Sequence, residues 1–168
     1  MATPTVSTFS PDTTRVYQEG IVAGILGGLA VAVWFLVVDL VQGRPLYTPT
    51  VLGTALFGRG AWPGSFENMP PSFEMVAMFT WVHLLAFAVI GVVVSRLIVM
   101  AEQHPSLGFG FVLLFVILEA CFTAAMMIVA APVLRALTWP AILVANLIAA
   151  AVMTGYFWFR HPTLAMRP

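Results

Sequence analysis

The sequence predicts an all-α integral membrane protein, a bundle of four transmembrane helices. Hydrophobic residues make up 61% of its 168 residues and charged residues only 8%, whereas a soluble domain carries roughly 25% charged residues. Four apolar runs are also long enough to cross a bilayer core, which takes about 20 helical residues. These runs are 21–42, 75–100, 107–131 and 140–159.

The chain divides into three parts: a polar N-terminal tail (1–20), a four-helix transmembrane domain (21–160) and a short C-terminal tail (161–168). The first apolar run exceeds the core of a signal peptide and has no small-residue cleavage site after it, so we expect a retained helix. Four spans place both termini on one side of the membrane. That side holds four arginines against three on the other, which favours cytoplasmic termini.

Glycines mark one face of the first span. Gly20, Gly24 and Gly28 recur at four-residue spacing, and small residues at this spacing let two helices approach closely. We therefore predict that Gly24 and Gly28 are helix-packing residues. Their partner is either another helix of the same chain or a neighbouring subunit, and periodicity leaves both open.

The connection between the first two spans, about thirty residues from 43 to 73, is long for a helical bundle. Within it, Thr48 followed by Pro49 is a helix start signal with threonine as the cap. The apolar residues of 50–57 then recur at helical spacing. We predict a short interfacial helix on the outer membrane surface. The alternative is an irregular cap over the mouth of the bundle.

Each span contains one notable polar residue, and such residues usually face the bundle interior and have a partner. They are Asp39, His83, Glu119 and Asn146. At the helical rise, their depth from the outer surface increases from roughly 5 Å for Asp39 to roughly 18 Å for Glu119. We predict that they form one intramembrane polar network. It serves either proton or cation transfer, or hydrogen bonding that fixes the helix register, which is the commoner role.

Charged residues near the outer end of the first span suggest an ion pair. Arg44 follows Asp39 at an offset of five residues, and we expect an ion pair between the two to close this span against the long loop. Arg135, in the turn before the fourth span, is a competing partner for Asp39 or Glu119. Arg44, Thr48 and Arg135 are thus the predicted loop and charge-pairing residues.

The sequence predicts no metal site, because the candidate ligands stand alone on their helices and no Glu-x-x-His pair is present. Haem held by two histidines is disfavoured, since only His83 lies within a span. His83 alone would suffice to ligate a chlorophyll-type pigment, so the cofactor is left open. Cys121 is the only cysteine, which excludes an intramolecular disulfide. Seven basic residues balance seven acidic ones, which leaves no basic surface for nucleic acid.

The stretch Trp34–Pro49, with sequence WFLVVDLVQGRPLYTP, resembles an uncharacterised family of small bacterial four-span membrane proteins. The element from Thr80 to His83 and the glutamate Glu119 resemble that family too. The resemblance covers about half of the chain. It implies the four-span architecture, a bacterial cytoplasmic membrane and the same choice of polar residues, and it implies no activity.

We expect a non-catalytic accessory or structural subunit of a larger membrane complex, of a bioenergetic (respiratory or photosynthetic) kind. Its expected partners are membrane lipid and other membrane subunits. The phosphate-binding loop, dinucleotide fingerprint and nucleophile elbow of soluble enzymes are all missing from the sequence. The alternative is a small proton- or cation-coupled transporter or channel that uses Asp39, His83 and Glu119. A lipid- or quinone-modifying enzyme with His83 as base is weaker, for lack of a second catalytic group.

Overall fold

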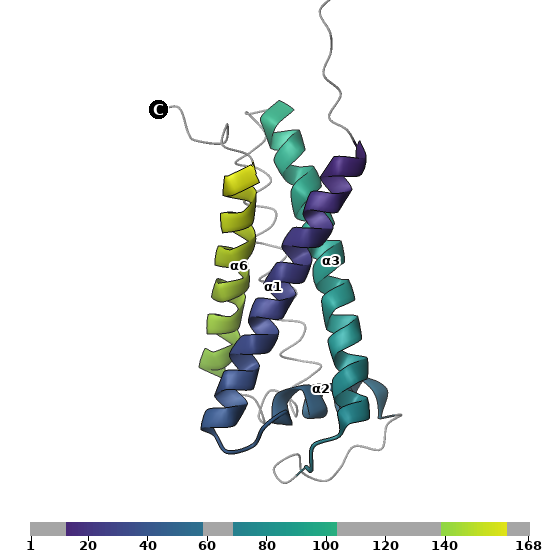
Figure 1. Ribbon diagram of the computed structural model, residues 1–168, viewed down its shortest axis with the longest axis vertical. Coiled ribbons are helices and arrows are strands. Elements are labelled where there is room, and N and C mark those ends of the chain that lie inside the picture. The colour runs from purple at the N-terminus through teal and green to yellow at the C-terminus, as the bar shows by residue number, and fades with distance from the viewer. Residues whose placement is uncertain (1–12, 59–68, 104–138, 161–168) are drawn as a thin grey trace, which may run out of the picture.

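The computed structural model describes residues 13–58, 69–103 and 139–160. Over these residues the chain is all-helical, without strands. The helices are α1 (Thr13–Val41), α2 (Tyr47–Phe57), α3 (Phe73–Gln103) and α6 (Trp139–Arg160). Figure 1 shows α1, α3 and α6 running along the long axis, with α2 lying across one end.

Three of the described helices, α1, α3 and α6, are long and apolar enough to cross a membrane. They correspond to three of the four predicted spans, and the chain has the helices of a membrane protein. The predicted span 107–131 lies outside the described residues. One boundary was wrong: α1 begins at Thr13, so residues 13–20 belong to this helix and not to a tail. A salt bridge one turn apart, between Arg15 and Glu19, supports this additional helical segment.

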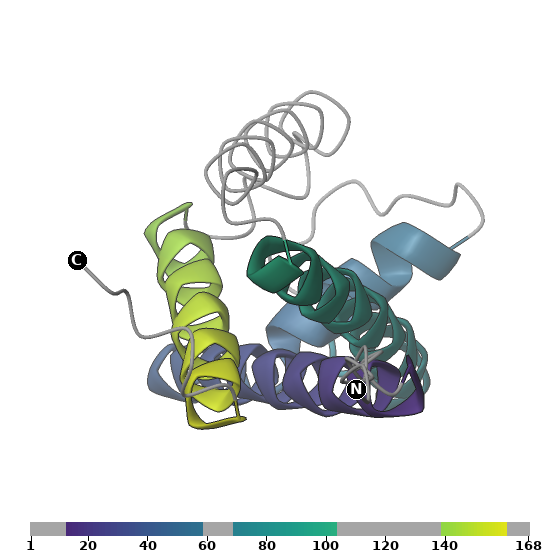
Figure 2. The same cartoon turned by 90° about the horizontal axis from the view of Figure 1, so that it is seen from above.

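Helix α1 packs against each of the other described helices, and α2 also packs against α3. Viewed along the long axis, α6 and α3 lie on the same side of α1 (Figure 2). The face of α6 that meets α1 consists of residues four apart. These buried residues are Ala141, Ala145, Ala149, Met153 and Phe157.

The closest approach is between α1 and α3, where glycines face each other. A Cβ atom on Gly24 would overlap the backbone of Phe87, and one on Gly91 would overlap the carbonyl oxygen of Gly20. Gly28 lies one turn further along α1, where a Cβ would come within 3.1 Å of the Phe87 side chain. Both predicted packing glycines of α1 therefore lie against α3 of the same chain.

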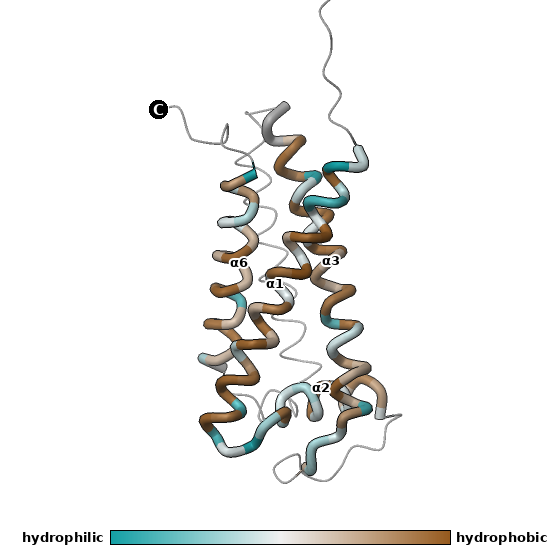
Figure 3. The backbone as a smooth tube through the Cα atoms, in the orientation of Figure 1, coloured by the Kyte–Doolittle hydropathy of each residue, from teal (hydrophilic) through white to brown (hydrophobic). Residues whose placement is uncertain are grey.

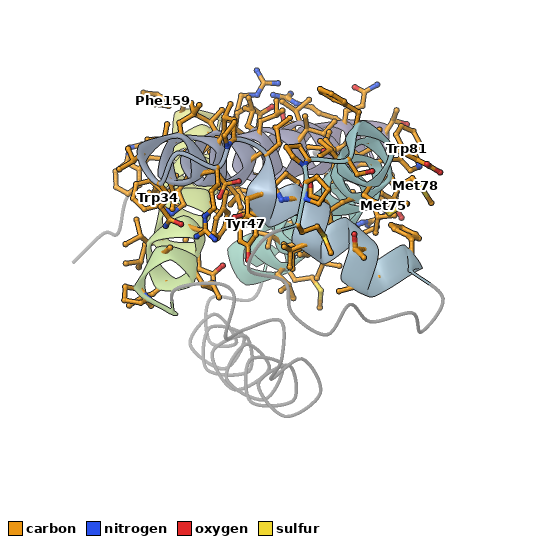
Figure 4. All side chains as sticks on the ribbon, turned by 90° about the horizontal axis from the view of Figure 1, so that it is seen from below. Trp34, Tyr47, Met75, Met78, Trp81 and Phe159 are labelled. Carbon is orange, nitrogen blue, oxygen red and sulfur yellow. The ribbon has the colours of Figure 1, made fainter. Side chains whose placement is uncertain are left out.

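Many large hydrophobic side chains are exposed on the outward faces of the long helices, as lipid contact requires. Hydrophobic residues cover the middle of α1, α3 and α6, and hydrophilic residues gather toward the ends (Figure 3). Trp81 is 72% exposed on α3, whereas Tyr47 of α2 is only 5% exposed. Figure 4 shows the same contrast from below, with Trp81 at the rim and Tyr47 among the helices.

Helix α2 occupies the segment where the sequence predicts a short helix, but its start differs from the prediction. Leu46 is the N-cap residue, in the left-handed conformation with φ 63° and without a side-chain cap. Thr48 is thus inside the first turn and is not the cap. Tyr47 and Val51 form a small buried cluster with Phe35 of α1 packed against it. Helix α2 is therefore held against the bundle by a buried face.

We predict that Gly24→Ala destabilises the protein by about 1–3 kcal/mol, because the added methyl group meets α3 backbone that cannot move aside cheaply. Gly155→Ala is the matched control, since a Cβ there meets nothing within 4 Å. It should be neutral, or stabilising by up to about 1 kcal/mol through helix propensity. Denaturant unfolding in detergent micelles measures both. Equal stability of the two variants would contradict the observed packing.

Candidate functional site

The carboxylate of Asp39 binds the first turn of α2. Its Oδ2 accepts a hydrogen bond from the Thr48 backbone N–H at 2.8 Å, and its Oδ1 accepts one from the Thr48 hydroxyl at 2.7 Å. Asp39 is only 1% exposed. The first backbone N–H groups of a helix lack intrahelical partners and carry partial positive charge. Asp39 thus caps α2 from the end of α1.

The turn between these helices brings the two residues together. Gly43 has φ 68° and Leu46 has φ 63°, both in the left-handed region. Glycine adopts this conformation freely, whereas for leucine it costs roughly 1–2 kcal/mol. The backbone N–H of Arg44 donates to the Asp39 carbonyl oxygen at 2.9 Å. The chain therefore reverses over a few residues and places Thr48 directly over the carboxylate.

The predicted ion pair between Asp39 and Arg44 is not formed. The guanidinium of Arg44 instead donates to Gln42 Oε1 at 2.8 Å and lies 4.2 Å from the centre of the Tyr47 ring. Arg44 is exposed, so its charge remains in a polar setting while Asp39 is bound by neutral donors. Arg135, the predicted competitor, lies outside the described residues.

His83 links the middle of α3 to α1. Its Nε2 lies 3.1 Å from the carbonyl oxygen of Gly28. A carbonyl oxygen only accepts, so Nε2 carries the proton in this contact. The ring also stacks with Phe79 at 5.6 Å and contacts Phe87 at 4.8 Å between centroids. Nε2 is thus occupied by a contact between helices, and a pigment bound through His83 would have to use Nδ1 or displace this bond.

Of the other two members of the predicted network, only Asn146 lies in the described part of the chain, and there it does not join Asp39 or His83. Asn146 is exposed on α6, because it directly follows Ala145 of the face that packs on α1. Glu119 lies outside the described residues. Asp39, near the end of α1, binds Thr48. His83 binds Gly28, eleven residues earlier in α1, so the two polar residues are not joined to each other.

Sequence reasoning missed a buried charge at the opposite end of the bundle. Glu19 is 4% exposed, and its Oε1 accepts from Arg15 Nε and from Arg160 Nη2, each at 3.0 Å. The acidic residue was assigned to a polar tail, and Arg160 is 141 residues away in sequence. The Arg15–Glu19 spacing of four residues is a local signal that residues 13–20 are helical.

Two further contacts tie side chains to the backbone of a neighbouring helix. The Ser95 hydroxyl of α3 donates to the Val16 carbonyl oxygen at 2.9 Å. The indole Nε1 of Trp34 donates to the Ala141 carbonyl oxygen at 2.9 Å. The first joins α3 to the start of α1, and the second joins the end of α1 to the start of α6.

Over residues 13–58, 69–103 and 139–160, no group of three or more histidine, cysteine, aspartate or glutamate side chains could hold a metal ion. No family model, curated protein or solved structure matches the chain. The resemblance to a bacterial four-span family therefore stays a prediction from the residues that carry it.

We predict that Thr48→Val destabilises α2 by about 1–3 kcal/mol, because a hydrogen bond to a buried carboxylate is lost. The matched control is Thr54→Val on the same helix, whose hydroxyl makes only a 3.5 Å contact with the Met69 sulfur. Hydrogen exchange of the α2 amides, measured with a global unfolding curve, reports the difference. The cap would be disproved if Thr48→Val exchanged no faster than Thr54→Val.

We also predict that His83→Phe destabilises the protein by about 1 kcal/mol, the usual scale of a hydrogen bond between membrane helices. Phenylalanine keeps ring contacts with Phe79 and Phe87 but provides no donor to Gly28. His83→Gln keeps a donor and should recover part of the loss. Unfolding in micelles gives both values, and unchanged stability in His83→Phe would mean that this bond does not hold the helices.

Proposed function

We propose that the protein is a non-catalytic subunit of a larger membrane complex, and that its buried polar groups hold its own helices together. One observation carries this proposal. Among the described residues, no buried side-chain nitrogen or oxygen lacks a hydrogen-bond partner. A relay or catalytic centre needs polar groups that exchange partners during its cycle. Here Asp39, His83 and Ser95 are each committed to a neighbouring backbone or helix terminus.

The outer face of α6 supports assembly with other protein. Asn146 is exposed there, between the exposed side chains of Leu143 and Leu147. An amide within a membrane span is unfavourable in lipid and normally bonds to another helix. We infer that this face contacts a second protein subunit. The proposed setting is a bacterial bioenergetic complex, with cytoplasmic termini as the arginine distribution favours.

The proposal is tested by purifying the native complex in a gentle detergent. Mass spectrometry and an absorption spectrum of the same chromatographic peak give its composition and any pigment. We expect co-migration with larger membrane subunits. A homogeneous, colourless oligomer of this chain alone would overturn the subunit role, and ion-flux assays of Glu119→Gln in vesicles would then test the transporter alternative.

Variants on α6 separate assembly from folding. Asn146→Leu should lower the yield of the complex while the isolated protein unfolds as the wild type does. Leu147→Ile, at the 62% exposed neighbouring position, is the control. Loss of both yield and stability would place the partner of Asn146 within the same chain and remove this support. Gly24 is unsuitable for such a test, because its substitution disrupts the contact between α1 and α3.

A further inference from the structure

The end of the bundle at which α1 begins and α6 ends carries two arginines on one buried carboxylate. Arg15 of α1 and Arg160 of α6 both donate to Oε1 of Glu19 at 3.0 Å. Sharing one oxygen atom fixes the two guanidinium groups beside each other. Glu19 is thus a scaffold that holds two cations from two helices at one point.

Among the described residues, the two arginines use only a minority of their donors, on Glu19. A guanidinium has five N–H donors, and the contacts with Glu19 use Nε of Arg15 and Nη2 of Arg160. The Arg15 side chain is 64% exposed and that of Arg160 is 47% exposed. These three side chains alone, two arginines and one glutamate, sum to a charge of +1. Guanidinium groups recognise phosphate through paired, parallel hydrogen bonds.

An apolar strip continues from this pair along α1 into the membrane. Val22, Leu26 and Leu29 follow Arg15 at seven, eleven and fourteen residues, so they lie on the same side of the helix. All three are exposed. A phosphate bound at the arginines would therefore have an apolar surface directly below it. Acyl chains would pack on this surface, whereas a free anion would make no favourable contact with it.

We propose that Arg15 and Arg160 form a headgroup site for an anionic phospholipid, with the phosphate on the two guanidinium groups and the acyl chains along Val22, Leu26 and Leu29. Basic sites between membrane helices bind such headgroups. The site is independent of the proposed subunit role, since it uses only this chain.

A third arginine at the same end belongs to the other side of α1. The guanidinium of Arg96, on α3, lies 4.4 Å from the centre of the Tyr17 ring. Tyr17 is two residues from Arg15, and two residues turn a helix by about 200°. Arg96 is therefore a control for local charge, and Arg44, at the opposite end beside α2, is a control for total charge.

The experiment is native mass spectrometry of the purified full-length protein with phosphatidylglycerol or phosphatidylcholine of identical acyl chains. We expect the wild type to prefer phosphatidylglycerol. Arg15→Gln/Arg160→Gln should lose that preference by roughly thirtyfold, because each basic residue near an anionic headgroup contributes about a factor of five. Arg44→Gln and Arg96→Gln should keep most of it.

Three outcomes would overturn the site. They are that the wild type binds the two lipids equally, that the double variant keeps the preference of the wild type, or that Arg96→Gln loses as much preference as Arg15→Gln/Arg160→Gln does. If inorganic phosphate or glycerol 3-phosphate bound as tightly as phosphatidylglycerol, the ligand would be a free phosphate and not a lipid. Arg15→Lys/Arg160→Lys retains both charges on Glu19 and should lose only part of the preference, so a fold defect of the glutamine variant does not remove the test.

Discussion

The backbones of α1 and α3 meet at a glycine contact, and the positions of the other described helices follow from it. Gly20 and Gly24 on one helix and Gly91 on the other leave no room for a Cβ atom. In a membrane, lipid tails are as apolar as leucine, so the usual hydrophobic force does not bring helices together. Dispersion contact over closely apposed backbones replaces it. With α3 fixed on one face of α1, α6 packs on the adjoining face. Helix α2 lies across the end of the bundle at which α1 and α3 diverge (Figure 1).

Hydrogen bonds from side chains join α1 to a neighbouring helix near its start, its middle and its end. Ser95 bonds near the start of α1, His83 near its middle, and Asp39 near its end. A hydrogen bond is electrostatically stronger in a medium of low dielectric constant, and an unpaired buried polar group there is costly. Side chains that bond to the carbonyl oxygens of a neighbouring helix therefore favour one register between helices whose apolar surfaces alone would tolerate several. These hydrogen bonds indicate that the described helices pack rigidly. Rigid packing suits the proposed structural subunit better than a channel gate, which has to move.

Sequence reasoning located α1, α3 and α6, three of the four predicted spans, because runs of twenty or more apolar residues have few other uses. The ends of the helices were harder. The Thr13–Gly20 segment is polar by composition, and its contacts with residues far away in sequence, such as Ser95 and Arg160, help to show why it continues α1. Gly24 was found from spacing alone, but spacing says nothing of which surface a glycine meets. Asp39 was identified as a site residue, yet its partner depended on two left-handed residues in the following turn, and both Arg44 and Thr48 lay within reach.

Asn146 shows why one polar residue in each span does not by itself predict a shared polar network. The prediction treated all four polar residues as facing a common interior, but the buried residues of α6 that pack on α1 recur at a spacing of four, from Ala141 to Phe157. A residue next to that stripe is rotated by about 100° from it. The asparagine therefore faces away from α1, where lipid would leave its amide without a partner. The proposed partner subunit on that side of α6 would give the amide its hydrogen bond, so the same physical rule that predicted an interior network is the reason for proposing a contact between subunits.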